Sequence, residues 1–149
     1  MDERFNIAPY HLELKQDGTV EDRAAIARRL DAYNDSQTGV EPDLPLAILI
    51  RSPSDGAIEG GLWGRSYYRW LFIELLFIPE PSRKVGLGTR IMDLAEAEAR
   101  RRGCLGAWLD SFSFQAPGFY EKRGYKIFAQ LDDYPPGQSR FFLSKRLND

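Results

Sequence analysis

Apolar positions recur along the chain with two different periods, and the two clearest patterns adjoin each other. The run over residues 70–78 is apolar throughout except at Glu74, which is typical of a strand covered on both faces. Between Leu87 and Ala99 the apolar positions follow helical spacing, which predicts an amphipathic helix that ends at Gly103. On the outer faces of this helix we expect acid–base pairs with i,i+4 spacing, Glu96 with Arg100 and Glu98 with Arg102.

The remaining patterns predict a sheet around this strand and helix. Further strands are predicted over residues 5–14, 46–51, 57–65, 105–109, 125–131 and 138–146, and further helices over residues 19–34 and just before Gly124. The strand over residues 105–109 should lie parallel beside the central one, because a crossover through a helix returns to the same sheet. We therefore predict an α/β (α+β) fold in a single domain over residues 1–149, with a mixed, mostly antiparallel sheet of about six or seven strands flanked by helices. Gly60-Gly61 indicates a bulge or a close approach to a ligand.

The turn between the central strand and its helix has the sequence Arg83-Lys84-Val85-Gly86-Leu87-Gly88. The first N–H groups of a helix lack intrahelical partners and lie at the positive end of its dipole, so a glycine-rich turn there suits an anion such as a pyrophosphate. An ordinary strand-to-helix turn with two solvated basic residues is the alternative interpretation.

Two other phosphate motifs fit this turn less well. A Walker A loop ends in Gly-Lys-Ser/Thr, which Gly88-Thr89-Arg90 does not supply. A dinucleotide fingerprint would use Gly86 and Gly88 together with Asp110, about 20 residues further on. However, Ile91 occupies the place of the third glycine, and the chain after Asp110 is too short to continue a doubly wound sheet. A dinucleotide-dependent oxidoreductase is therefore the weaker alternative.

The order Arg-x-x-Gly-x-Gly, from Arg83 to Gly88, resembles the acyl-CoA pyrophosphate loop of the GNAT superfamily of N-acetyltransferases. Residues 116–125, Ala-Pro-Gly-Phe-Tyr-Glu-Lys-Arg-Gly-Tyr, resemble that family's late Ala…Tyr-x-Lys-x-Gly-aromatic signature. The resemblance spans about residues 44–147. It implies a GNAT-like fold whose parallel strand pair is splayed around the acyl-CoA. It also implies an acetyl-CoA-dependent N-acetyltransferase in which a primary amine attacks the thioester directly through a tetrahedral intermediate.

The resemblance also implies which residues surround acetyl-CoA. The donor arm and thioester carbonyl would pair with the main chain of Leu76, Phe77 and Ile78. The other donor contacts that it implies are Arg83, Lys84, Val85, Gly86, Leu87, Gly88, Thr89, Ser113, Phe119 and Lys122. Ser113 departs from the family pattern, which often has asparagine there, and its hydroxyl has less reach toward the donor.

The same signature makes Tyr120 the general acid for the departing thiolate. A phenol with a pKa of about 10 stays protonated at neutral pH and can protonate a thiolate whose conjugate acid has a pKa near 8.5. Aromatic packing between helix and sheet is the alternative role for Tyr120. Glu74 is the candidate base, because burial against a cavity would raise the pKa of an acid in an apolar strand. A solvated or salt-bridged Glu74 is the competing interpretation, and positioning of the amine alone could also suffice. Asp110 and Tyr33 are alternative bases and candidate acceptor-binding residues.

Composition limits the partners that we expect. The chain has 149 residues, of which 43% are apolar, and a net charge of −2, so neither nucleic acid nor an anionic membrane is expected to bind it. The expected acceptor is a small-molecule amine, or an amino group of a peptide or protein. The sequence contains neither a signal sequence nor an apolar run of about 20 residues, so we expect a cytoplasmic location. One histidine, His11, and one cysteine, Cys104, predict neither a metal site nor an internal disulfide.

Two further alternatives concern function and assembly. A non-catalytic acyl-CoA-binding sensor or interaction domain could keep the same fold, but the presence of Tyr120 favours the enzyme. A group of aromatic residues could line an aromatic pocket or a homodimer contact, or pack in the sheet: Trp63, Tyr67, Tyr68 and Trp70.

Overall fold

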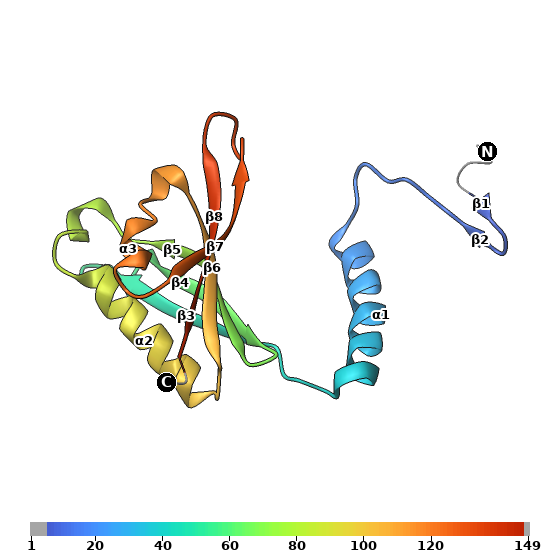
Figure 1. The fold of residues 1–149 in the computed structure, drawn as a ribbon, viewed down its shortest axis with the longest axis horizontal. Coiled ribbons are helices and arrows are strands. Elements are labelled where there is room, and N and C mark those ends of the chain that lie inside the picture. Colours follow the sequence, from blue (N-terminus) through green and yellow to red (C-terminus); the bar gives the residue numbers. More distant parts are fainter. Residues whose placement is uncertain (1–5, 148–149) are drawn as a thin grey trace. The chain divides into compact units, whose positions relative to one another are not determined.

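The computed structural model describes residues 6–147, which belong to two compact units that meet between Val40 and Glu41 in the sequence (Figure 1). The single domain expected from the chain length stays a prediction. Within residues 6–147, no helix combines the length and the apolar character needed to cross a bilayer.

The first unit contains a short strand pair and one helix. Strands β1 (Asn6–Ile7) and β2 (Tyr10–His11) are antiparallel, so the single strand predicted over residues 5–14 is wrong in its described part. Pro9, between them, has no N–H to donate to a strand ladder. Helix α1 (Val20–Thr38) begins as predicted at Thr19, whose hydroxyl accepts a hydrogen bond from the Asp22 N–H at 3.1 Å. The helix runs four residues beyond its predicted end near Asn34. It ends before Gly39, whose φ of +82° does not continue a helix.

The second unit is a sheet of six strands. These are β3 (Leu44–Arg51), β4 (Ile58–Tyr67), β5 (Trp70–Phe77), β6 (Gly106–Phe112), β7 (Lys126–Asp132) and β8 (Ser139–Arg146), in the order β3-β4-β5-β6-β8-β7. All neighbours are antiparallel except β5 and β6, which are parallel as predicted. The predicted mixed, mostly antiparallel sheet is therefore confirmed, and it is not the doubly wound parallel sheet that a dinucleotide-binding fold requires.

Helix α2 (Leu87–Arg101) covers one face of this sheet and supplies one half of its core (Figure 1). Its buried apolar residues are Ile91, Met92, Ala95 and Ala99. They pack with buried strand residues that share one face of the sheet, Leu71, Ile73, Ala107, Leu109 and Leu143. The helical spacing predicted from the sequence is thus the spacing of the residues in contact with the sheet.

The two adjacent glycines in β4 allow neighbouring backbones to approach closely. A side chain on Gly61 would clash with the carbonyl oxygen of Ile48, and the Cβ of one on Gly60 would lie 2.5 Å from the carbonyl oxygen of Phe77. The register between β3 and β4 also shifts beside Gly60. The predicted bulge is present, and the close approach is to the flanking strands.

Glu96 corrects one prediction about α2. The sequence predicts it on an outer face with Arg100, but it is buried, with 3% of its surface exposed. Its carboxylate accepts hydrogen bonds from Lys145 Nζ at 2.7 Å, from an Arg123 guanidinium nitrogen at 3.0 Å and from the Tyr125 hydroxyl at 3.1 Å. The i,i+4 rule considers only neighbours on the same helix and therefore could not identify these partners. The second pair, Glu98 with Arg102, is present at 3.1 Å.

We predict that Glu96→Ala lowers the free energy of unfolding by about 3 kcal/mol, because it leaves two cations and a phenol without their shared buried acceptor. Glu98→Ala is the matched control on the same helix, since Glu98 pairs with arginines at the surface. Urea denaturation midpoints measure both changes. Equal losses in the two variants would contradict a special role for the Glu96 network.

Candidate active site

Strands β5 and β6 separate halfway along their length. They pair in parallel only from Trp70 with Gly106 to Ile73 with Leu109, although β5 continues to Phe77 and β6 to Phe112. On the other side of β5, the register with β4 shifts so that Glu74 is an extra, unpaired residue. A bulge bends its strand, and here the bend coincides with the end of the parallel pairing. The opening between the strands therefore presents backbone groups that pair with no neighbouring strand.

The residues at the far end of β5 lead into the glycine loop and α2. Gly86 is the N-cap residue of α2 with φ of +77°, a left-handed conformation that explains a glycine at this position. No side chain caps this end of the helix, and no acidic residue lies in its first turn. The N–H groups of Leu87, Gly88 and Thr89 are thus those that the start of a helix leaves without intrahelical acceptors. The geometry is that of an anion site.

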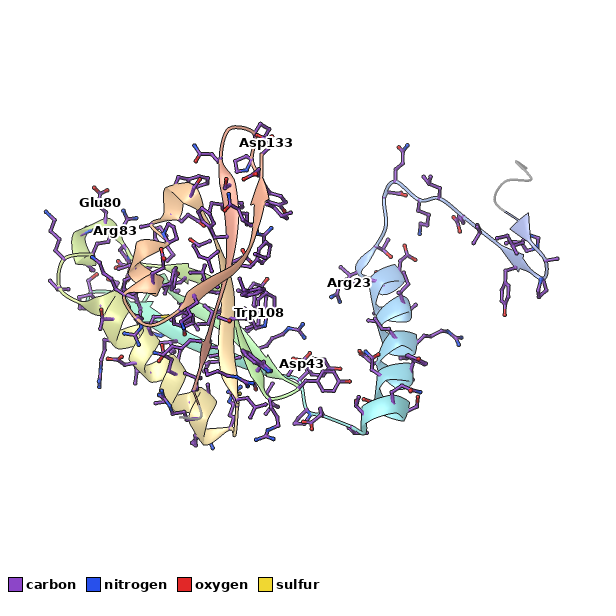
Figure 2. The ribbon with its side chains drawn as sticks, in the orientation of Figure 1. Arg23, Asp43, Glu80, Arg83, Trp108 and Asp133 are labelled. Atoms are coloured by element: carbon purple, nitrogen blue, oxygen red, sulfur yellow. The ribbon has the colours of Figure 1, made fainter. Side chains whose placement is uncertain are left out.

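Arg83 ties this loop to the end of β5. Its Nε donates a hydrogen bond to the carbonyl oxygen of Ile78 at 2.9 Å, and its guanidinium lies 5.9 Å from the centre of the Phe77 ring. The Ile78 carbonyl is therefore already occupied, which leaves Leu76 and Phe77 as the better main-chain candidates for donor binding. Figure 2 shows Arg83 and Glu80 on the loop that precedes α2.

The predicted donor residues come together from three segments. A Cβ on Gly88 would lie 3.4 Å from the Phe119 ring and 3.6 Å from Ile78, so the loop, the end of β5 and the Phe119 segment are adjacent. Leu87 and Phe119 are half-buried against the core. The exposed residues of the set are Phe77, Arg83, Lys84, Val85, Gly86, Thr89 and Lys122. Lys122 follows the single turn of α3 (Gly118–Glu121).

Tyr120 lies on α3 and is half-buried. Its ring meets those of Phe119 and Tyr125 edge-on, with centres 5.2 Å and 6.1 Å apart. Burial raises the pKa of Tyr120 to about 12, and the negative charge of Asp110 adds to the rise. No hydrogen bond joins the Tyr120 hydroxyl to the rest of residues 6–147. The phenol is therefore a protonated donor over the whole physiological pH range.

The two candidate acids stand at the start of the opening but differ in their surroundings. Glu74 follows Ile73, the last residue of β5 that pairs with β6. It is exposed and forms no ion pair with any described residue. Asp110 follows Leu109, the last residue of β6 that pairs with β5. It is half-buried and binds Arg140 through Oδ1 at 2.8 Å and 3.0 Å. The burial expected of Glu74 is absent, whereas the charge of Asp110 is balanced by an arginine.

Ser113 lies in the short 3-10 helix η3 (Ser113–Gln115), just after β6. Its hydroxyl donates to Gln138 Oε1 at 2.6 Å and accepts from the Ser139 N–H at 3.1 Å. Both contacts join η3 to the start of β8. A contact between Ser113 and the acyl donor would have to use the remaining lone pair of the Ser113 hydroxyl.

Three of the other residues considered from the sequence lie outside this group. Tyr33 belongs to α1 in the first unit, and its role at the acceptor stays a prediction. Cys104 is buried, and burial raises the pKa of its thiol, which makes it a poor nucleophile. In the described part of the chain, which includes His11, no three histidine, cysteine or acidic side chains gather as a metal site would require.

Sequence reasoning missed Arg140 and Glu96. Arg140 lies in a segment that the sequence predicts as a strand, but its partner Asp110 depends on the register of β8 against β6. Glu96 connects to Tyr120 through Tyr125, whose hydroxyl donates to Glu96 and whose ring contacts Tyr120. Nothing local in the sequence indicates that connection.

Comparison with known proteins agrees with this geometry. The model of the acetyltransferase (GNAT) family matches residues 12–125. A blasticidin-S acetyltransferase of Streptomyces morookaense is 43% identical over 93 residues, which cover 62% of this chain and 68% of that protein. Acetyltransferase Atu2258 of Agrobacterium fabrum is 38% identical over 122 residues, 82% of this chain and 88% of that protein. The crystal structure of an acetyltransferase from Bacillus cereus, 34% identical, superposes with a TM-score of 0.79 over 91% of this chain and 98% of its own.

We predict that Gly86→Glu abolishes binding of coenzyme A, because the side chain would place bulk and negative charge where the pyrophosphate meets the start of α2. Gly103→Glu is the matched control: Gly103 follows the other end of the same helix, has φ of +80°, and, as at Gly86, a Cβ added there would meet no atom within 4 Å. Both variants thus carry the same charge and the same backbone strain. Isothermal calorimetry should detect coenzyme A binding to Gly103→Glu alone; equal losses would assign the effect to strain.

Proposed function

Because this chain belongs to the acetyltransferase (GNAT) family, whose enzymes take an acyl group from acyl-CoA, we propose that it moves the acetyl group of acetyl-CoA to a primary amine of a small molecule. The amine nitrogen attacks the thioester carbonyl carbon directly and forms a tetrahedral intermediate. Its collapse breaks the carbon–sulfur bond, so the products are an N-acetylated amine and coenzyme A.

The separation of β5 and β6 is the observation that carries this proposal. An extended pantetheine arm between the strands would pair with the backbone of Leu76 and Phe77, which continues past Ile73, the last residue paired with β6. The thioester would then lie near the point of separation, where a main-chain N–H can stabilise the oxyanion. The pyrophosphate would reach the uncapped start of α2, with Arg83 and Lys84 beside it.

Tyr120 is the proposed general acid for the departing thiolate. Its pKa of about 12 keeps the proton on the phenol until the carbon–sulfur bond breaks. The hydroxyl has no competing partner among the described residues, so it is available to the sulfur. Transfer of its proton to a thiolate yields the thiol of coenzyme A and a phenolate, which regains a proton from water or from the amine.

Glu74 is the proposed acceptor of the amine proton, directly or through water. It is a carboxylate without an ion-pair partner among the described residues and lies at the point of separation, whereas the Asp110 carboxylate is already bound to Arg140. Because Glu74 is exposed, it also attracts a cationic amine from solution. Asp110 contributes negative charge on the other side of the opening.

A small amine is the favoured acceptor. Support comes from the relative named for blasticidin S, a small molecule, which shares 43% identity over 93 residues. The net charge of only −2 does not favour a polyanionic partner, and it does not repel a cationic amine. We place the reaction in the cytoplasm, where acetyl-CoA is available as the donor.

We predict that Tyr120→Phe lowers kcat for acetyl transfer by about 100-fold, because the variant lacks the proton for the thiolate. Binding of acetyl-CoA, measured by calorimetry, should change little. In the unaltered protein the phenol is protonated up to about pH 11, so an alkaline loss of kcat below about pH 10 that disappears in Tyr120→Phe would contradict the assignment.

We predict that Glu74→Gln lowers kcat/KM for the amine by about tenfold or more, because the amide cannot accept the proton of the amine. Glu59→Gln is the control, because Glu59 is also an exposed glutamate at a register shift. That shift lies between β4 and β3, away from the opening. Steady-state release of free thiol measures both. An unchanged kcat/KM in Glu74→Gln would show that the amine loses its proton to bulk water.

A further inference from the structure

A shallow depression of about 390 Å³ lies beside the proposed acceptor end of the opening. Its walls are two separate segments: the end of β6 with η3, and the turn between β7 and β8. The lining residues are Phe112, Phe114, Asp133, Tyr134 and Pro135. Figure 2 shows Asp133 at the tip of the β7–β8 hairpin. The lining is almost wholly apolar, as is usual where a small molecule binds.

The depression adjoins the reaction site through Arg140. Phe112 lies two residues after Asp110 on β6, so both side chains share one face of the sheet. Arg140 pairs with Phe112 in the strand register and binds the carboxylate of Asp110. Its guanidinium also lies 5.5 Å from the centre of the Phe112 ring and 4.8 Å from that of Tyr134. An acceptor whose amine is near Asp110 could therefore extend into the depression.

Hydrogen bonds hold the two walls in place. Ser113 joins η3 to Gln138 and Ser139. Within the hairpin turn, the Gln138 N–H donates to the Pro135 carbonyl at 2.8 Å, and the Gly137 N–H donates to the Asp133 carboxylate at 3.2 Å. The depression is thus formed before any ligand binds, which lowers the entropic cost of binding.

The aromatic rings of the depression are nearly parallel. The planes of Phe112 and Phe114 differ by 6° with centres 5.3 Å apart, and those of Phe112 and Tyr134 differ by 21° with centres 5.7 Å apart. Phe114 is 61% exposed and Tyr134 is 44% exposed. Parallel, exposed ring faces favour a flat partner that stacks in an offset arrangement.

The charge already present decides what kind of flat partner fits. Arg140 occupies the cation-binding faces of Phe112 and Tyr134 and of a third ring, Phe142, at 5.5 Å. A second cation there would be repelled by the guanidinium, so a cationic group is disfavoured. The carboxylate of Asp133, which also lines the depression, disfavours an anionic group. An uncharged planar ring gains stacking and apolar contact without that penalty.

We propose that Phe112, Phe114 and Tyr134 form an acceptor subsite that stacks an uncharged aromatic or heteroaromatic ring, whose attached primary amine is acetylated at the adjoining opening. This inference rests on the proposed function and names its substrate class. Arg140 positions the Phe112 and Tyr134 rings. It also holds the Asp110 carboxylate, which lies between this subsite and the proposed position of the acceptor's amine.

The test compares 2-phenylethylamine with 2-cyclohexylethylamine as acceptors. The two amines share chain length and charge, but only the first ring is planar. Stacking should make kcat/KM about tenfold higher for 2-phenylethylamine. A merely apolar patch would instead favour the cyclohexyl ring, which is larger and more hydrophobic. Equal values, or a preference for the cyclohexyl amine, would overturn the proposal.

Two variants locate the effect. Phe114→Ala should bring the ratio of the two kcat/KM values to about one, because it removes an exposed stacking face. Phe128→Ala should leave the ratio unchanged, since Phe128 is similarly exposed but lies on β7 outside the depression. A ratio unchanged by Phe114→Ala would overturn the assignment of the subsite.

A binding measurement separates this inference from the proposed function. Saturation-transfer NMR of 2-phenylethylamine with the coenzyme A complex reports contact with the ring protons without turnover. A ring signal lost in Phe114→Ala but kept in Phe128→Ala supports the subsite even if neither amine is acetylated. In that case the proposed activity toward such amines fails and the subsite stands. Acetylation of the ringless amine spermidine, with no ring signal from 2-phenylethylamine, would overturn the subsite and leave the acetyltransferase function standing.

Discussion

The second unit depends on one buried carboxylate. Glu96 lies on the sheet-facing side of α2 and accepts hydrogen bonds from Lys145 on β8 and from Arg123 and Tyr125, which follow α3. A buried charge is tolerated only when it is paired and its oxygens are satisfied, and here three donors meet that condition. As a result α2, α3 and β8 are fixed relative to one another. Tyr120, which contacts Tyr125, takes its place from this network although it belongs to none of the hydrogen bonds.

The second constraint is the unpaired Glu74 in β5. An extra residue on one side of a strand bends it, and the parallel pairing with β6 ends at the residue before the bulge. The same local irregularity therefore opens the sheet and exposes the carboxylate proposed as base. On the opposite strand Asp110 is held by Arg140, so two acids at equivalent places have different electrostatic surroundings and suit different tasks.

The donor and acceptor sides of the opening are built by different means. In the proposed reaction the donor would meet main-chain groups: the backbone of β5 on the side away from β4, and the start of α2, where glycine at position 86 supplies a left-handed turn. The proposed acceptor would meet side chains from the end of β6 and the β7–β8 turn, which Ser113 and Arg140 connect. Main-chain recognition suits a donor common to a family, whereas side chains can differ between acceptors.

The sequence by itself determined the features that depend on neighbouring residues: the apolar stripe of α2, the turn at Gly86 and the position of most strands. It also determined the parallel pair, through the general rule for a crossover connection and not through a local pattern. Period, capping and backbone conformation are local, so they can be read from short windows. Its errors have the same origin: it placed Glu96 outside, and it continued one strand through Pro9. Only the tertiary structure decided the partners of Glu96, the pairing of Asp110 with Arg140 and the stacking of Phe112 with Tyr134. These contacts join segments about 20 to 50 residues apart, and they depend on strand register and bulges that no local pattern specifies.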